Sequence, residues 1–452
     1  MTATTSTPFG APMKEHFLFD ANFKNLNHGS YGTYPRAVQT ALRQFQDDAE
    51  ARPDAFGRIT RAQGIDESRQ AVAKLLNVPV NECVFVKNAT TGINTVLRNL
   101  VFQPGDAIVY FDTVYGAVEY GLVSLTESTP VQTRKVEYQF PISHDDLLLR
   151  FREVVRTARA EGLNVRVAVF DTIVSVPGVR FPFERLVEIC REELILSLVD
   201  GAHGIGHLPL DLGTLQPDFF TSNCHKWLFV PRGCAVLYVP LRNQHLIRTT
   251  FPTSWGFIPR SASPQTLPGA SKSAFEYLFE QVSTTDDTPY LCVPAALKFR
   301  AEVCGGEDRI HAYLEQLAQE GSDIVADALG TEVMQEADGE ARLMRGCGLA
   351  TVRLPIAVSA VASGDAFATV RDGGGSYLRV RSSVVPDVLI WFRDTLINRY
   401  GTFVMVFSYG GWLWTRLSAQ VYLERSDFVW VAGVLKECCG RVEGEVGVLV
   451  KS

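Results

Sequence analysis

A short segment in the middle of the chain holds an acid, histidines and a lysine whose arrangement suggests cofactor chemistry. Asp200 directly follows the apolar run 194–199, which predicts a buried strand. An acid at the end of such a strand lies where α/β sheets bind ligands. Lys226 follows a second short apolar run, with His225 directly before it. A lysine that can form a Schiff base and an acid that can pair with a ring nitrogen are the two groups that pyridoxal 5′-phosphate requires. We therefore predict a pyridoxal 5′-phosphate site with Lys226 as the cofactor-bearing residue.

The two motifs that hold these residues also resemble those of a known family. They read Asp200-Gly201-Ala202-His203 and Asn223-Cys224-His225-Lys226-Trp227. They are similar to fold-type I, class V aminotransferases, and within that family to isopenicillin N epimerase-like, fungal ergothioneine C–S lyase-like and loline-biosynthesis enzyme-like members. The likeness extends from Leu26 to about Phe428. The cofactor-binding residues that we predict on this basis are Thr90, Thr91, Tyr115, Ser175, Asp200, His203, Asn223, His225, Lys226 and Thr284.

A turn of small residues is expected to bind the phosphate group. The predicted strand 83–86 is followed by the turn 88–92, which opens a helix. Backbone N–H groups at a helix N-terminus attract anions, so Thr90 and Thr91 are candidate phosphate ligands.

Two loop residues are candidates for contact with the cofactor ring. Tyr115 follows the predicted strand 107–111, and the resemblance places the stacking ring in this loop, where desulfurase members have histidine. A phenol beside the reacting carbon could also move a proton, so Tyr115 is a candidate catalytic residue alongside Lys226. Ser175 stands where desulfurase relatives have an asparagine that contacts the phenolic oxygen of the ring, and its hydroxyl reaches less far.

The substrate is expected to be an amino acid held by its carboxylate. Apolar and polar residues alternate over 414–422, which places Arg416 on a strand. Arginine is the side chain best shaped to take a carboxylate through two hydrogen bonds, and the segment resembles the Arg-x-Ser-Ala motif of the family. The turn 26–32 lies over the active site in that family, so Asn27 and His28 are candidates for substrate contact.

A further segment suggests that the chain pairs with a second copy of itself. Residues 282–286 resemble a family Gly-Thr-x-Asp signature whose threonine binds the phosphate of the partner subunit, with Ser283 in place of the glycine. Thr284 would be that threonine. The resemblance therefore implies a homodimer with shared active sites.

The order of the predicted elements indicates an α/β fold. Strand patterns alternate with helical patterns, which predicts a mostly parallel, doubly wound sheet. With the resemblance, we expect a fold-type I architecture: a seven-stranded sheet in a large domain plus a smaller α+β domain. The expected boundaries are an N-terminal arm and helix over 1–60, the large domain over 61–305 and the small domain over 306–452. A loop at the active-site mouth is predicted over 261–273, and a surface insertion around 371–376.

The composition argues against several classes of partner. The 452 residues are 46% hydrophobic and 21% charged, with a net charge of −7. This acidic balance, without runs of Lys or Arg, disfavours nucleic acid and anionic membranes. No apolar stretch reaches the ~20 residues that span a bilayer, and no signal-like segment is found. The nine cysteines are scattered without metal-type spacing, so we expect no metal site and reduced thiols in a cytoplasmic enzyme.

The motifs predict an amino-acid-transforming enzyme and leave its reaction open. One candidate is carbon-skeleton or ring-forming chemistry in fungal secondary metabolism, as in loline-type alkaloid pathways. The alternative is C–S cleavage of a cysteine conjugate, as in ergothioneine formation. C–S lyase members carry a basic cluster shortly before the Arg-x-Ser-Ala motif, where this chain reads Ser408-Tyr409-Gly410-Gly411-Trp412, which is neutral and aromatic. This difference favours the first candidate and a substrate with a bulky or cationic end.

Three other readings are weaker. No cysteine lies in a recognisable persulfide setting, which argues against a cysteine desulfurase. An amino-acid epimerase or aminotransferase shares the same motifs and stays open. A protein that had lost catalysis would not need Lys226, Asp200 and Arg416 together.

Overall fold

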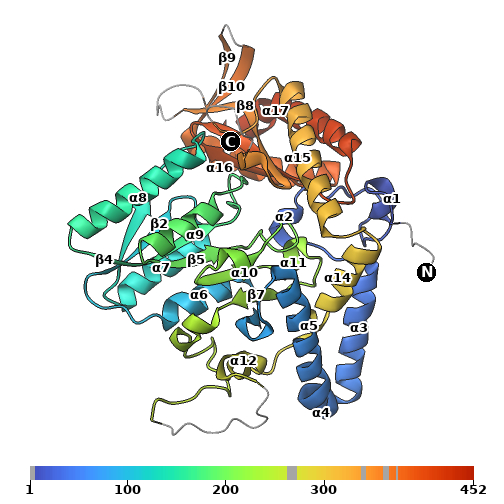
Figure 1. The fold of residues 1–452 in the computed structure, drawn as a ribbon. Helices are drawn as coiled ribbons and strands as arrows, with labels where there is room; N and C mark the ends of the chain where they lie inside the picture. The colour runs from blue at the N-terminus through green and yellow to red at the C-terminus, as the bar shows by residue number, and fades with distance from the viewer. Residues whose placement is uncertain (1–5, 262–271, 337–342, 360–365, 373–374, 452) are drawn as a thin grey trace.

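The computed structural model describes residues 6–261, 272–336, 343–359, 366–372 and 375–451, which form two sheets surrounded by helices (Figure 1). The larger sheet has seven strands in the order β1-β7-β6-β5-β4-β2-β3. Its strands are β1 Cys83–Val86, β2 Asp106–Phe111, β3 Gln132–Val136, β4 Asn164–Asp171, β5 Leu196–Asp200, β6 Phe219–Ser222 and β7 Ala235–Tyr238. Only β7 runs antiparallel to its neighbours. The prediction of a mostly parallel seven-stranded sheet is confirmed.

Helices cover both faces of this sheet, which is why its strands read as continuous apolar runs. Along β2, Ile108 and Tyr110 belong to one buried cluster, while Val109 and Phe111 belong to another on the opposite face. Helices α6 Ala89–Asn99 and α7 Gly116–Ser128 contribute to the first cluster, and α8 His144–Ala160 and α9 Phe183–Glu192 to the second. The sheet is therefore doubly wound, as expected.

The second sheet has five strands in the order β11-β12-β8-β10-β9. They are β8 Leu349–Ser359, β9 Phe367–Asp372, β10 Gly375–Arg381, β11 Met405–Tyr409 and β12 Trp412–Ser418, with helices α15 Glu307–Leu329, α16 Val385–Tyr400 and α17 Arg425–Lys451. Arg416 lies on β12, as the alternating pattern predicts. Arg371 and Ser376, which we expected in a surface insertion, pair across β9 and β10 as part of this sheet, and residues 373–374 between them lie outside the described residues.

The N-terminal segment joins the two sheets. It contains α1 Ala11–Lys14, α2 His28–Tyr31, α3 Arg36–Ala51, α4 Pro53–Ala55, a π-helix at Phe56–Thr60 and α5 Arg61–Leu76. The Ser418 N–H donates to the Leu26 carbonyl at 2.9 Å, and the Thr7 N–H donates to the Val303 carbonyl, also at 2.9 Å. Figure 1 shows α1 and α2 near the orange and red C-terminal elements, and α3 and α5 beside the yellow α14 Val293–Glu302. The Gly29 N–H donates to the Ser418 hydroxyl at 3.2 Å, and the His28 ring lies 2.7 Å from the Lys226 carbonyl, so the turn that contains α2 lies between the second sheet and the segment after β6.

Shorter elements complete the chain. They are α10 Leu212–Leu215, α11 Cys224–Trp227, α12 Ala274–Glu280, α13 Thr288–Leu291 and α14 Val293–Glu302, with 3-10 turns at Val80–Glu82, Leu241–Leu246, Leu343–Arg345 and Ser382–Val384. The predicted loop over 261–273 lies almost entirely outside the described residues. Among the residues that are described, no helix combines the length and apolar character needed to cross a membrane.

Candidate active site

Lys226 lies in the single turn of α11, directly after the C-terminal end of β6. Its Nζ is 3.2 Å from Nε2 of His203. Burial and the positive charge of Arg416 lower the pKa of Lys226 to about 8, against the opposing effect of the Asp200 and Asp171 carboxylates. An amine with this pKa is partly uncharged near neutral pH, so it can act as a nucleophile and as a base.

Two carboxylates lie side by side beneath this lysine. Asp200 ends β5 and Asp171 ends β4, and the two residues are direct partners in the parallel ladder. Side chains at partnered positions point to the same face of the sheet. Burial raises the pKa of Asp200, and burial together with the Asp200 charge raises that of Asp171 well above its usual range. The pair is suited to hold a protonated ring nitrogen, because a cation there would relieve the repulsion between them.

The N-terminus of α6 is prepared for an anion. Asn88 caps it by accepting the Thr91 N–H at 2.8 Å, and the Asn223 side chain accepts the Ala89 N–H at 2.8 Å. The N–H and hydroxyl of Thr90 have no such partner in the described part of the chain. A Cβ on Gly92 would lie 2.3 Å from the Thr221 hydroxyl, so only glycine lets this helix approach β6 so closely. Asn223 therefore positions the helix, while Thr90 presents free donors.

His225 follows Asn223 by two residues and is partly buried. Its Nδ1 donates to the Cys234 carbonyl at 2.9 Å, which leaves Nε2 for another partner. Burial lowers the pKa of His225 to about 4. A bound phosphate would oppose that shift, because a nearby anion favours the protonated ring.

Tyr115 stands at the N-cap position of α7 with half of its surface exposed. Its ring is therefore free to cover a flat ligand. Ser175 lies in the loop after β4, beside Arg416. The Ser175 carbonyl accepts from Nη1 of Arg416 at 2.6 Å, while the Ser175 hydroxyl is 3.4 Å from the same nitrogen.

Arg416 is fully enclosed, with 1% of its surface exposed. Its Nη2 donates to the Asn27 side-chain oxygen at 2.9 Å and to the Ser30 hydroxyl at 2.8 Å. Its Nε is buried and has no hydrogen-bond partner among the described residues. Burial lowers the pKa of Arg416 to about 10, which leaves it charged at neutral pH. A buried cation with an unused donor is poorly compensated, so a substrate carboxylate would stabilise it.

Asn27 and His28, the two candidates for substrate contact in the N-terminal turn, have different surroundings. Asn27 contacts Arg416 directly, as described above. The His28 ring is buried between the Tyr422 hydroxyl at 2.9 Å and the Lys226 carbonyl at 2.7 Å, and burial lowers its pKa to about 3. Both ring nitrogens are therefore occupied by the protein. In this structure His28 supports the backbone of Lys226 and offers no free atom to a substrate.

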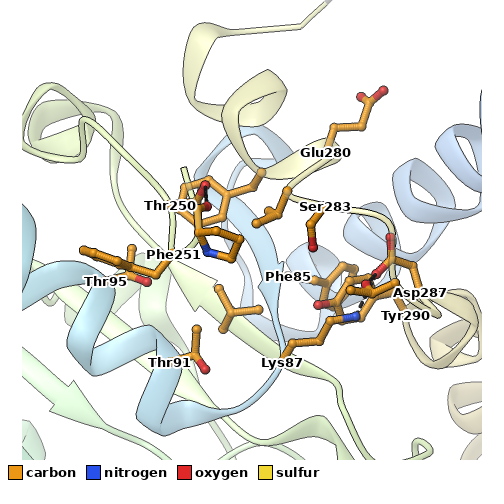
Figure 2. Close-up of a pocket in the computed structure, with 15 residues that line it drawn as sticks. Phe85, Lys87, Thr91, Thr95, Thr250, Phe251, Glu280, Ser283, Asp287 and Tyr290 are labelled. Carbon is orange, nitrogen blue, oxygen red and sulfur yellow. Dashed lines mark hydrogen bonds and ion pairs between the residues drawn. The ribbon is translucent and has the colours of Figure 1, made fainter. Parts of the chain in front are cut away.

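The segment with Thr284 borders a cavity of about 150 Å³ (Figure 2). Ser283 and Thr285, the neighbours of Thr284, line this cavity together with Thr91 of the predicted phosphate site. Thr284 itself is exposed in the single chain. Lys87 spans the cavity edge and forms an ion pair with Asp287 at 2.7 Å.

The aromatic segment 408–412 consists of neutral residues, but a charged residue lies against it. The guanidinium of Arg353 from β8 lies over the Trp412 ring, 4.3 Å from its centroid. The Tyr409 hydroxyl accepts the Phe140 N–H at 2.8 Å. A cation from a neighbouring strand thus lies against this segment, and the hydroxyl of its tyrosine already has a hydrogen-bond partner. The preference for a substrate with a bulky or cationic end stays a prediction.

Sequence reasoning missed three residues of the site. They are Asp171, Ser30 and Trp227, of which the last donates to His203 at 3.1 Å. Asp171 ends an apolar run in the same way as Asp200, and this pattern was a usable signal. No pattern in the sequence pointed to Ser30 or to the indole N–H of Trp227.

Comparison with known proteins gives the site its context. The family model for aminotransferase class-V matches residues 32–254. The L-cysteine desulfhydrase-like protein lolT1 of Epichloe uncinata is 44% identical, over 96% of this chain and 97% of that protein. The hercynylcysteine sulfoxide lyase of Schizosaccharomyces pombe is 29% identical over 95% and 98%, and the L-cysteine desulfhydrase of Arabidopsis thaliana 30% over 82% and 78%. The chain belongs to the class V aminotransferase family. The resemblance noted in the sequence is thereby confirmed.

Solved structures agree on the fold of this class V aminotransferase family member. The cystine C–S lyase C-DES in complex with cysteine persulfide superposes with a TM-score of 0.70 at 18% identity, covering 92% of this chain and 98% of that one. The cysteine desulfurase of Thermococcus onnurineus has a TM-score of 0.69 at 16% identity, covering 94% and 97%. The fold-type I architecture is therefore confirmed.

Family membership makes this protein a pyridoxal 5′-phosphate enzyme, and its residues fit that cofactor. Asp200 and Asp171 offer negative charge for the ring nitrogen, Lys226 offers an amine for the aldehyde, and the α6 N-terminus offers donors for the phosphate. When bound, the cofactor accepts the electrons of a bond broken at the substrate Cα. Lys226 would be the group to hold or move the proton at that carbon, and Arg416 would orient the carboxylate.

Proposed function

We propose that this enzyme transforms an amino acid in fungal secondary metabolism, by the carbon-skeleton or ring-forming chemistry of loline-type alkaloid pathways. The observation that carries the proposal is the 44% identity with lolT1 across nearly the full length of both chains. The site supports an amino-acid substrate, because Arg416 combines a buried charge with an unused Nε donor.

C–S bond cleavage is the second candidate, and a specific observation favours it. The names of the relatives include L-cysteine desulfhydrase-like protein, L-cysteine desulfhydrase and hercynylcysteine sulfoxide lyase. Both reactions need the same first events, namely carboxylate binding by Arg416 and removal of the Cα proton by a base such as Lys226. A desulfurase that relays sulfur through a mobile cysteine is less well supported, because eight of the nine thiols are buried and Cys439 is half-buried. Nine free thiols also fit the cytoplasmic location that we infer.

A substrate comparison separates the two candidates. The holoenzyme would be incubated in ²H₂O with L-cysteine, with a cysteine-sulfoxide conjugate and with amino acids that carry a side-chain amine able to close a ring. We expect deuterium at Cα and a cyclic product by mass spectrometry from the last group. Efficient release of sulfide, or of a cleaved sulfur fragment, from the cysteine compounds alone would favour the lyase. Lys226→Ala protein serves as the blank in every reaction.

We also infer a homodimer in which Thr284 of each subunit completes the site of the other. The observations that support it are the exposure of Thr284 and the large apolar side chains exposed nearby: Phe251 lines the cavity of Figure 2 with 45% of its surface exposed, and Trp255 is 83% exposed. Exposed apolar surface of this kind marks an interaction site. Obligate dimer interfaces typically bury roughly 2,000 Å² or more. Sedimentation is expected to show a dimer.

A subunit-mixing experiment tests the shared site. Lys226→Ala and Thr284→Ala chains would be co-expressed with different tags, and the mixed dimer purified. If Thr284 acts across the interface, one site of the mixed dimer holds both intact residues, and about half of the unmodified activity per dimer returns. Activity no higher than that of the Thr284→Ala chain, or a monomer with full cofactor occupancy, contradicts the inference.

A further inference from the structure

Trp227, the residue after the cofactor lysine, directs a hydrogen-bond donor at a histidine of the site. Its ring is completely buried. Its Nε1 lies 3.1 Å from Nδ1 of His203. An indole N–H only donates, so Nδ1 of His203 must present its lone pair.

This contact fixes the proton position on His203. The ring is 1% exposed, and burial, with the nearby positive charge of Arg416, holds its pKa well below the usual range. His203 is therefore neutral and carries a single ring proton. Since Nδ1 accepts from Trp227, that proton is on Nε2.

The proton position of His203 in turn constrains Lys226. Nε2 of His203 lies 3.2 Å from Nζ of Lys226, and a protonated Nε2 can only donate. The partner must therefore accept, which an ammonium group cannot do. We propose that Trp227 is a positioning residue that fixes His203 as its Nε2–H tautomer, so that His203 donates to the uncharged amine of Lys226 and keeps it ready to capture the cofactor.

The uncharged amine is the reactive form. Lys226 bonds to the aldehyde carbon of the cofactor through its nitrogen lone pair, and the two amine protons leave with the aldehyde oxygen as water. A protonated Lys226 has no lone pair and must first lose a proton. The His203 tautomer therefore acts on the rate at which the apoenzyme becomes the holoenzyme.

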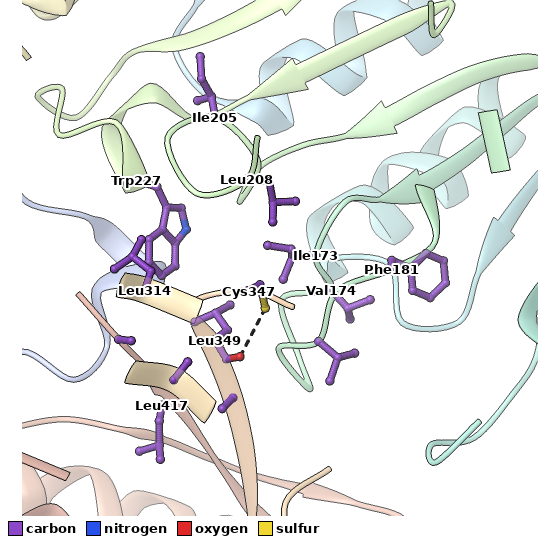
Figure 3. Close-up of a cluster of buried hydrophobic side chains, with 14 of the residues drawn as sticks. Ile173, Val174, Phe181, Ile205, Leu208, Trp227, Leu314, Cys347, Leu349 and Leu417 are labelled. Atoms are coloured by element: carbon purple, nitrogen blue, oxygen red, sulfur yellow. Dashed lines mark hydrogen bonds between the residues drawn. The ribbon is translucent and has the colours of Figure 1, made fainter. Parts of the chain in front are cut away.

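The surroundings of Trp227 are rigid enough for this role. The His207 ring stacks on the indole with centroids 3.6 Å apart, and its Nδ1 donates to the His203 carbonyl at 2.9 Å. The Gly348 N–H donates to the other nitrogen of His207 at 2.6 Å. Figure 3 shows Trp227 in a buried cluster with Leu314 and Leu349 from the C-terminal part of the chain. Both sheets thus contribute to holding the indole in place.

The charged groups around Lys226 come from several elements. They are Asp171 on β4, Asp200 on β5, His203 after β5 and Arg416 on β12. His28 and His207 also act on His203. The three histidines have lowered pKa values and Arg416 has one of about 10. The pKa of Lys226 is lowered to about 8, while burial raises the pKa values of the Asp171 and Asp200 carboxyls.

Trp227→Phe tests the proposal, because it keeps an aromatic ring and removes the N–H. His203 is then free to move its proton to Nδ1 and accept from a charged Lys226, which raises the pKa of the amine. The pH midpoint for capture of pyridoxal 5′-phosphate by the apoenzyme, followed by absorbance, is expected to rise by about one unit, so that capture at pH 7 slows roughly tenfold. A folded Trp227→Phe protein with an unchanged midpoint would overturn the proposal.

Two controls separate positioning from general stability. Trp391→Phe removes a comparably buried indole donor, which gives its hydrogen bond to Glu445 at 3.0 Å on α16 and α17, away from the site. It should leave the midpoint unchanged even if it lowers the melting temperature. In a His203→Ala background, Trp227→Phe should add no further shift. An equal shift in that background would show that the indole does not act through His203.

The tautomer is also measurable without any substitution. Neutron diffraction from deuterium-exchanged apoenzyme crystals is expected to show deuterium on Nε2 of His203 and none on Nδ1. Deuterium on Nδ1 would exclude the proposal even if Trp227→Phe fails to fold. The inference rests on Lys226 as the cofactor-bearing residue, but the tautomer is read in the absence of cofactor. The two assignments can therefore fail separately.

Discussion

Replacing Lys226 with alanine is expected to abolish turnover while the protein still folds. The side chain supplies both the amine that holds the cofactor and the base placed to move the proton at the substrate Cα. A positioned acid or base alone contributes roughly 10²- to 10⁴-fold, so we expect at least a 10³-fold loss of kcat. Product formation under saturating cofactor, measured by mass spectrometry, is the readout.

Lys298→Ala provides the matched control for this experiment. Lys298 is exposed on α14, and its removal should change neither activity nor cofactor absorbance. The melting temperature of the Lys226→Ala protein should stay near that of the unmodified apoenzyme, because burial raises the pKa values of Asp171 and Asp200 and the pair can bind a proton in place of the lost amine. Turnover within tenfold of the unmodified enzyme would contradict the role of Lys226.

Replacing Arg416 with lysine is expected to weaken substrate binding and leave the cofactor in place. Lysine keeps the charge and loses the planar set of donors that contact Ser175, Asn27 and Ser30. A charge-assisted hydrogen bond contributes about 1.5–3 kcal/mol, so losing one substrate contact should raise KM roughly 10- to 100-fold. Steady-state kinetics with the amino acid identified in the substrate comparison provides the measurement.

Arg353→Lys separates this effect from a general change of charge on the second sheet. Arg353 lies on β8 over Trp412 and pairs with Glu332 at 3.4 Å. Its replacement should affect KM by less than the Arg416 substitution. An unchanged KM in Arg416→Lys protein, or loss of its cofactor absorbance, would show that Arg416 does not bind the carboxylate.

The architecture was predictable because its physical signals are local. Buried strands read as apolar runs, so the runs 83–86 and 107–111 located β1 and β2 almost to the residue. The alternation around Arg416 correctly placed it on a strand of the second sheet. The fold-type I assignment came from the resemblance, since no local pattern states the order of the strands.

The contacts of the site depend on register and on distant elements, so they were not predictable. Asp171 meets Asp200 only because β4 and β5 pair in that register. The His28 ring forms a hydrogen bond with the hydroxyl of Tyr422, which is nearly 400 residues away in sequence. The predicted substrate contact at His28 therefore could not be judged from the turn alone. Arg353 on β8 lies over Trp412 on the paired strand β12. Its charge therefore lies beside the segment 408–412, whose own residues are neutral.

Chemical mapping of the cofactor linkage tests the central claim most directly. The purified holoenzyme is expected to be yellow, and borohydride reduction followed by proteolysis and mass spectrometry should find the pyridoxyl group on the peptide that contains Lys226. The Lys226→Ala protein should give no labelled peptide. A colourless protein that takes up no added pyridoxal 5′-phosphate, or a label on another lysine, would contradict the account of this site.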